Sequence, residues 1–149
     1  HSPDAQKATA MCVTRTLILT GSRYGHVQCW SHSVTKNENF KRIAIFSQEE
    51  FKCKFSFINV GSQWQHGCPI TAICCSELSL IDFSFDEDGY CVCSDLKHMQ
   101  VLSKFCAHAG KVNCAELLDE EGLLLTGGCD CVAKIWRIWI PKITRAVEQ

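Results

Sequence analysis

The chain has 149 residues, a formal net charge of −1 at pH 7 and 21% charged residues. This length fits one small domain with a buried core, and the near-neutral charge argues against a general nucleic-acid or polybasic membrane binder. Hydrophobic residues make up 46% of the chain, an ordinary share for a globular protein. Because no apolar run is long enough to cross a membrane as a helix, we expect no membrane insertion.

The first part of the chain predicts short strands separated by turns. Residues 17–19 form an apolar run followed by Thr20 and Gly21, and Trp30 lies ten residues after Thr20. Between residues 51 and 57, Phe and Cys alternate with Lys and Ser, which predicts an amphipathic outer strand. Residues 31–50 would then form a long loop, which is either a functional loop or a tolerated surface excursion.

The last part of the chain shows the strand pattern most clearly. The predicted elements are a strand at 112–115, a turn at 119–122, a buried strand at 123–126, a turn at 127–130 and a strand at 132–136. In the middle part, residues 100–105 predict a fourth, outer strand. The fold class is therefore all-β. A repeated unit of four antiparallel strands is typical of a β-propeller blade.

Several features repeat with a spacing of 42 residues. The matched pairs are His66 and His108, Ser84 and Thr126, and Asp88 and Asp130. Because no gap is needed to align all three pairs, we predict one domain of three repeated units. The units cover about residues 1–65, 66–107 and 108–149, and the first carries the extra loop.

The twelve cysteines leave three interpretations open, namely reduced core residues, disulfides and metal ligands. Most of them lie among apolar, strand-like residues, where a free cysteine behaves as a small hydrophobic side chain. The chain has no C-x-x-C pair, the spacing most typical of a zinc site. We therefore favour reduced core thiols, no bound metal or cofactor, and a cytoplasmic location.

The last unit resembles the WD-repeat family of β-propellers. The resemblance rests on Ala107-His108 and on residues 123–130 and 132–137, although Ala107 replaces the Gly of the family pattern and Arg137 replaces its closing Asp. It extends to the other two units with weaker motifs. It implies about three four-stranded blades that form part of a larger ring. The open ends would be covered by the rest of the propeller or by a second copy of the chain.

The resemblance also implies a hydrogen-bonded network within each blade that joins a His, a Ser or Thr, an Asp and a Trp. The matching positions are His108, Thr126, Asp130 and Trp136 in the last unit, His66, Ser84 and Asp88 in the middle unit, and Thr20 and Trp30 in the first. Ser94 stands where the middle unit would have its Trp, and Tyr24 stands at the Asp position of the first unit. We interpret these residues as structural, because a buried carboxylate needs hydrogen-bond donors and an imidazole can supply one.

The sequence contains no motif of a known enzyme class, and we expect no catalytic residues. The resemblance implies a scaffold that presents rigid loops to other proteins, with Arg23, Tyr24 and Glu87 as candidate contact residues in exposed turns. The alternative is a structural segment of a larger regulator, either a ubiquitin-ligase substrate receptor or a membrane-trafficking regulator, whose activity lies in other domains.

Overall fold

The computed structural model describes residues 7–32 and 57–138, and every element in these ranges is a β-strand. The strands are β1 (Ala8–Val13), β2 (Leu17–Ser22), β3 (His26–His32), β4 (Phe57–Trp64), β5 (Ile70–Ser76), β6 (Ile81–Asp86), β7 (Tyr90–Asp95), β8 (Gln100–Cys106), β9 (Val112–Leu118), β10 (Leu123–Gly128) and β11 (Ala133–Arg137). The predicted long loop at 31–50 lies mostly outside the described residues, and so does most of the outer strand predicted at 51–57. No helix in the described ranges could cross a membrane.

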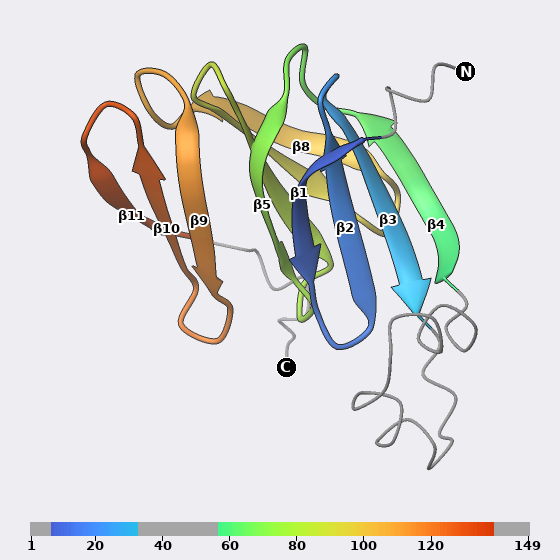
Figure 1. Ribbon diagram of the computed structural model, residues 1–149. Coiled ribbons are helices and arrows are strands. Elements are labelled where there is room, and N and C mark those ends of the chain that lie inside the picture. The colour runs from blue at the N-terminus through green and yellow to red at the C-terminus, as the bar shows by residue number, and fades with distance from the viewer. Residues whose placement is uncertain (1–6, 33–56, 139–149) are drawn as a thin grey trace, which may run out of the picture.

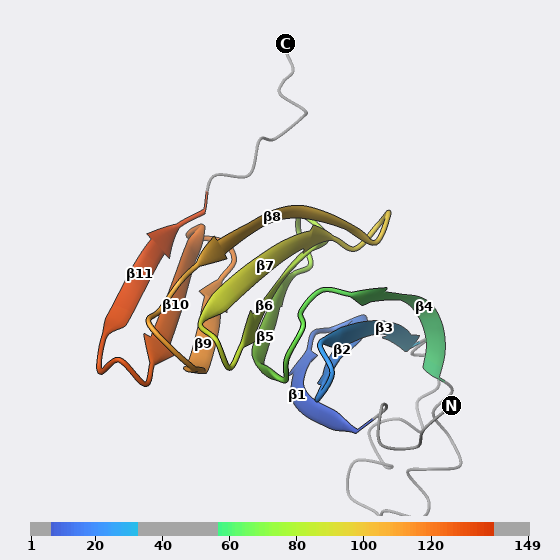
Figure 2. The same cartoon turned by 90° about the horizontal axis from the view of Figure 1, so that it is seen from above.

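The strands form three antiparallel sheets, which confirms the predicted all-β class. The first sheet has the order β1-β2-β3-β4, the second β5-β6-β7-β8, and the third β9-β10-β11. The sheets stand side by side, with β1, β5 and β9 as neighbours across the two junctions (Figures 1 and 2). The outer strand of the first sheet is β4, which begins where the predicted strand ends.

Apolar side chains from neighbouring sheets pack face to face. Leu19, Val27 and Cys29 of the first sheet are buried against Ile70 and Ile73 of the second. In these strands successive side chains point to opposite faces, so alternate residues enter the same contact.

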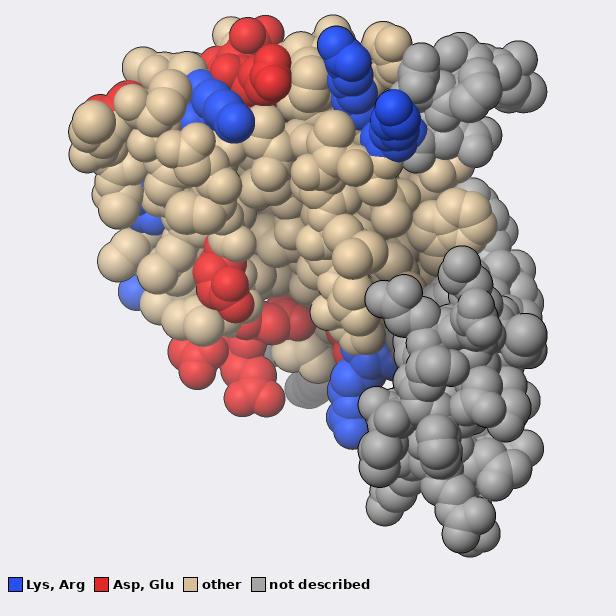
Figure 3. Space-filling model, viewed as in Figure 1, with Lys and Arg blue, Asp and Glu red and all other residues tan. Residues whose placement is uncertain are grey.

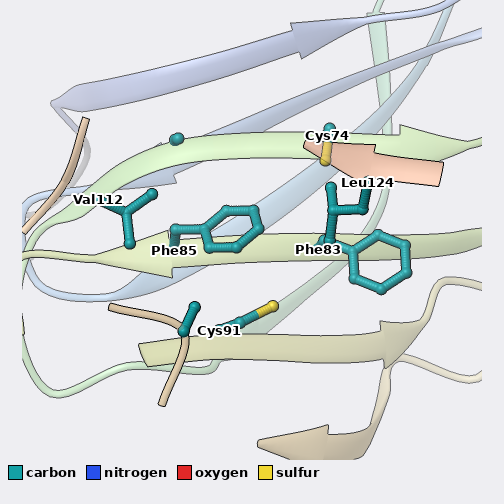
Figure 4. Close-up of a cluster of buried hydrophobic side chains, with 8 residues drawn as sticks. Cys74, Phe83, Phe85, Cys91, Val112 and Leu124 are labelled. Carbon is teal, nitrogen blue, oxygen red and sulfur yellow. The ribbon is translucent and has the colours of Figure 1, made fainter. Parts of the chain in front are cut away.

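The second junction is built in the same way and contains the larger side chains. Phe83, Phe85 and Cys91 of the second sheet pack against Val112 and Leu124 of the third (Figure 4). Phe85 is fully buried, and burial of a Phe side chain stabilises a fold by about 1.5–3 kcal/mol. The two junctions therefore supply most of the core and hold the sheets in one array.

The upper edge of the array in Figure 1 carries the β2–β3, β6–β7 and β10–β11 turns. In the first two turns, Gly25 and Gly89 have φ angles of 87° and 92°. The Gly25 carbonyl accepts hydrogen bonds from the backbone N–H groups of Gln65 and His66, and the Gly89 carbonyl accepts two from the connection that follows β8. A Cβ at Gly89 would lie 2.0 Å from the carbonyl oxygen of His108. Glycine is therefore required there both for its φ angle and for the close approach.

Side chains tie the sheets together at the lower edge. Thr16 donates to Glu77 Oε1 from its backbone N–H at 2.8 Å and from its hydroxyl at 3.0 Å. Ser76 Oγ donates to Asp119 Oδ1 at 2.6 Å across the second junction. Each junction is therefore held by hydrogen bonds at both edges and by apolar contacts between them.

Candidate functional site

The third sheet brings together all four side chains that the repeat pattern selects. His108 Nδ1 lies 3.0 Å from Asp130 Oδ1, and His108 Nε2 lies 2.8 Å from Thr126 Oγ1. Trp136 Nε1 donates to the same Thr126 hydroxyl at 2.9 Å. Thr126 can therefore accept from Trp136 and donate to His108, while His108 Nδ1–H donates to Asp130. The set links the connection before β9 to β10, β11 and their turn.

The carboxylate of this network also shapes the turn between β10 and β11. Asp130 Oδ1 accepts from the backbone N–H of Val132, and Oδ2 accepts from that of Ala109, each at 3.1 Å. Desolvation opposes its charge, but these N–H groups and the His108 imidazole together lower the pKa of Asp130. Asp130 is therefore an ionised structural acceptor.

Within the described residues, the first sheet contains only part of this arrangement. Trp30 Nε1 donates to Thr20 Oγ1 at 3.4 Å. Tyr24, at the aligned Asp position, is 47% exposed. Instead, Ser22 Oγ accepts from the backbone N–H groups of Tyr24 and His26 at 3.3 and 3.1 Å. Ser22 therefore shapes this turn, although the repeat pattern does not single it out.

In the second sheet the prediction of Asp88 as the network carboxylate is wrong. His66 Nε2 lies 2.7 Å from Ser84 Oγ, but His66 Nδ1 lies 2.7 Å from Asp86 Oδ2. Asp88 is exposed, and its backbone N–H donates to Asp86 Oδ1 at 2.9 Å. Asp86 also accepts from the N–H of Tyr90 at 2.9 Å, so its interactions match those of Ser22.

The reason for the difference is the residue two positions after the Ser or Thr. In the second sheet this residue is Asp86, at the end of β6, where its carboxylate reaches the imidazole directly. In the third sheet it is Gly128, where a Cβ would lie 2.6 Å from His108 Cγ and 2.8 Å from Asp130 Oδ1. The glycine leaves room for the carboxylate of Asp130 to enter from the turn. The spacing of 42 residues aligned the backbones correctly and selected the wrong carboxylate.

The second sheet also replaces the tryptophan with a polar group that sequence reasoning missed. In the third sheet Leu124 pairs with Trp136 across two strands, and the equivalent pair in the second sheet is Asp82 and Ser94. Ser94 donates to Asp82 Oδ1. The only signal in the sequence is an acidic residue at the repeat position of a buried leucine.

Gln65 joins this polar pair to the imidazole network. Its side-chain amide lies 2.6 Å from Ser84 Oγ and 2.7 Å from Ser94 Oγ. Asp82 is fully buried, and its Oδ2 atom has no hydrogen-bond partner among the described residues. Burial raises the pKa of Asp82 to about 7, although hydrogen bonds from Ser94 and Gln65 favour the charged form.

The cysteines of the described residues are free thiols. Burial raises the pKa of Cys29 and of Cys93 to about 11, and it raises the pKa of Cys74, Cys75 and Cys91 further. A thiol needs to ionise to act as a nucleophile or a metal ligand. These side chains therefore contribute apolar volume to the junctions.

An apolar cavity of about 590 Å³ lies between the second and third sheets. Its walls include Phe83, Phe105, Leu124 and Trp136, and the rings of Phe105 and Trp136 have centroids 5.1 Å apart. Ser103, Arg137 and Cys93 are the polar or titratable residues of the lining. This lining offers surface to an apolar group and no set of paired acid and base residues.

The candidate contact residues all lie at the upper edge. Arg23 and Tyr24 are exposed in the β2–β3 turn, and Glu87 is exposed in the β6–β7 turn. Figure 3 shows acidic and basic side chains close together along this edge, above a largely uncharged face. The upper edge therefore carries both signs of charge.

Comparison with known proteins bears on the class of this fold. Residues 99–137 match the family model described as WD domain, G-beta repeat. The match spans β8 to β11 and includes Thr126, Asp130 and Trp136. No curated protein matches the chain.

The three antiparallel sheets and the internal network define β-propeller blades. Residues 99–137 match a WD repeat, and the three sheets are consistent with a partial WD-repeat propeller. The resemblance inferred from the sequence is therefore confirmed.

Proposed function

We propose that the chain is a non-catalytic scaffold that binds other proteins along its upper edge. The observation that carries this proposal is that a side-chain oxygen fixes each of the three turns there. Ser22 Oγ and Asp86 Oδ1 each accept from the N–H groups two and four residues later, and Asp130 Oδ1 accepts from the one two residues later. Turns that are already ordered lose little conformational entropy when they bind a partner.

The side chains presented by these turns favour a protein partner. Arg23 and Tyr24 offer a cation and an aromatic ring, and Glu87 with Asp88 offers negative charge nearby. Aromatic residues and Arg contribute strongly to protein interfaces. Nucleic acid is a poor fit because the whole chain carries a net charge of −1. We also propose a cytoplasmic location, supported by free thiols packed inside both junctions.

The test compares two sets of substitutions. The upper-edge variant carries Arg23→Glu, Tyr24→Ala and Glu87→Lys. The control carries Glu120→Lys and Glu121→Lys, two exposed positions at the opposite edge, in the β9–β10 turn. Proteins captured from cytoplasmic extract are identified by mass spectrometry, and each is then purified and titrated against all three chains.

We expect the upper-edge variant to bind those partners at least about tenfold more weakly, a loss of about 1.4 kcal/mol. The control is expected to bind like the unmodified chain. Equal affinities of all three chains for every captured partner would contradict the assignment of the upper edge. Thermal unfolding of each variant checks that its fold is intact.

A second candidate function is that of a structural segment of a larger regulator. It is favoured by the exposed apolar faces at the two ends of the array. Ile135 of the third sheet is 71% exposed, whereas Cys29, at the equivalent position of the first sheet, is buried against its neighbour. At the other end, Met11 and Val13 of β1 are 63% and 61% exposed. A further sheet, from a larger propeller or from a second copy, would cover both faces.

The solution mass separates the two candidates. A monomer without affinity for a hydrophobic dye, with partners bound at the upper edge, would favour the scaffold acting alone. A dimer would indicate that two copies cover each other's faces, because head-to-tail contacts can close into a ring. A monomer that binds the dye would favour the structural segment.

A further inference from the structure

A continuous chain of buried hydrogen-bond contacts crosses the second sheet. In order, it joins Asp86, His66, Ser84, Gln65, Ser94 and Asp82. The first four contacts are 2.7, 2.7, 2.6 and 2.7 Å long, and Ser94 completes the chain to Asp82. All six residues are buried. Each inner member contacts two neighbours, so the position of one hydrogen constrains the next.

With a neutral imidazole and an ionised Asp86, the hydrogen-bond chain has one complete arrangement. His66 Nδ1–H donates to the Asp86 carboxylate, so Nε2 must accept from the hydroxyl of Ser84. If the Gln65 amide is reversed from its orientation in the structure, its N–H donates to Ser84 and its oxygen accepts from Ser94. Ser94 then no longer donates to Asp82, so the contact between them is complete only when a protonated Asp82 donates to the Ser94 oxygen.

A second complete arrangement has the Gln65 amide in the orientation that the structure shows. Its N–H then donates to Ser94, its oxygen accepts from Ser84, and Ser94 donates to an ionised Asp82. Because Ser84 no longer donates to the imidazole, His66 must carry a hydrogen on both nitrogens. The two arrangements therefore hold the same single proton, on Asp82 in one and on His66 in the other.

Loss of that proton leaves the chain incomplete. Five contacts need five hydrogens, and without the proton only four can fill them: one from the imidazole, one from each serine and one from the amide, whose oxygen faces its other contact. One contact must then bring two acceptors together. A buried polar contact without a hydrogen is costly because water cannot replace it.

The incomplete end would lie at the junction with the first sheet. Asp82 belongs to the row Cys75-Asp82-Ser94 on β5, β6 and β7. The titratable groups that interact with Asp82 from the surrounding strands are thiols. They are Cys12 of β1, Cys29 of β3, Cys74 and Cys75 of β5, and Cys91 and Cys93 of β7. Burial raises the pKa of each of these thiols, so they stay neutral and do not offset a charge on Asp82.

His66 and Asp86 form the other end of the hydrogen-bond chain, and the charge of Lys104 also acts there. Burial lowers the pKa of His66, the Asp86 carboxylate opposes that effect, and the positive charge of Lys104 on β8 adds to the lowering. A neutral His66 favours the arrangement in which Asp82 holds the proton.

We propose that this hydrogen-bond chain is a one-proton switch that couples pH to the docking of the first sheet on the second. With the proton bound, the chain is complete and the junction is closed. When the proton leaves, opening of the junction lets water solvate Asp82. The pKa of about 7 for Asp82 places this change close to neutral pH. This inference concerns the fold and does not rest on the proposed binding function.

The direction of the effect follows from proton binding. In the open junction Asp82 is solvated and has an ordinary, low pKa, whereas in the closed junction its pKa is raised. The closed state therefore holds the proton over a pH range in which the open state has lost it, and closure weakens as pH rises through that range. Above about pH 7 both states have lost the proton and the effect levels off.

The experiment measures amide hydrogen exchange of the full chain by mass spectrometry between about pH 5 and pH 8, with correction for the intrinsic exchange rate. For β1, β2 and β3 we expect the opening constant, relative to that of an Asp82→Asn variant, to rise by up to about tenfold per pH unit until it levels off. The variant should lack this rise because its neutral amide can always donate to Ser94. The matched control Asp88→Asn removes an exposed carboxylate that is not part of the hydrogen-bond chain. Its exchange should respond to pH like that of the unmodified protein.

Infrared spectra of the unmodified chain provide a second measurement that needs no variant. We expect the band of one protonated carboxyl group to persist above about pH 5, where solvated carboxyls have ionised, and to disappear as pH rises through the neutral range. The proposal would be overturned by equal pH responses of the unmodified chain and the Asp82→Asn variant. It would also be overturned by an equal response in β9–β11, or by the absence of a protonated carboxyl near neutral pH.

Discussion

Replacing Asp86 with alanine tests which carboxylate the second sheet uses. The substitution leaves His66 Nδ1, now 2.7 Å from the carboxylate, without an acceptor in a pair whose side chains are 0% and 3% exposed. It also removes the acceptor of two turn N–H groups at 2.9 Å. A buried unsatisfied donor costs about 1–3 kcal/mol, and each lost turn hydrogen bond about 1 kcal/mol. We therefore expect Asp86→Ala to lower the free energy of unfolding by about 3–5 kcal/mol.

The matched control is Asp88→Ala, two residues along the chain. Asp88 is exposed and contributes its backbone N–H to the turn, so its substitution should change the free energy of unfolding by no more than about 0.5 kcal/mol. Urea unfolding followed by circular dichroism measures both values. A loss for Asp88→Ala as large as that for Asp86→Ala would refute the assignment of Asp86 as the partner of His66.

Three further predictions concern the turns, the tryptophan and the buried acid. Gly89→Ala should lower the free energy of unfolding by more than about 1 kcal/mol, since Gly89 has a φ of 92° and a Cβ there would meet backbone atoms. Gly67 has open space around it, so Gly67→Ala should have little effect in the same urea assay. Trp136→Phe keeps an aromatic ring but loses the hydrogen bond to Thr126, so calorimetry should show a loss of about 1 kcal/mol; an unchanged stability would remove Trp136 from the network. Burial raises the pKa of Asp82 to about 7. The free energy of unfolding of Asp82→Asn, relative to that of the unmodified chain, should therefore increase by at most about 4 kcal/mol as pH rises from about 4 to 7. A difference that does not change with pH would contradict a raised pKa.

The sequence predicted the function of this protein only at the level of its family resemblance. The motif residues around His108 indicated a WD repeat, and the family match at residues 99–137 confirmed it. The match supports a role in protein interaction in general. The partner and the upper-edge contact surface remain proposals, because surface side chains are not constrained by the packing that makes the repeat visible.

The sequence by itself determined the all-β class, the repeated strands and most of the network positions. These features come from local alternation and from the spacing of His, Ser or Thr and Trp, which is kept wherever equivalent strands pack in the same way. Trp30 and Trp136, for example, each donate to the hydroxyl that the family resemblance implied as their partner.

Only the tertiary structure decided which polar groups meet inside the second sheet. Asp86 and Asp88 are both aspartates, so the sequence alone does not select between them. Asp86 of the second sheet stands at the position of Gly128 in the third, and this difference determines which carboxylate reaches the imidazole. Gln65 lies in the connection between β4 and β5, and Asp82 lies on β6. They meet through Ser94 only because this connection packs together with β6 and β7. Hydrogen bonding between buried groups depends on positions within a few tenths of an ångström, and residue spacing does not carry that information.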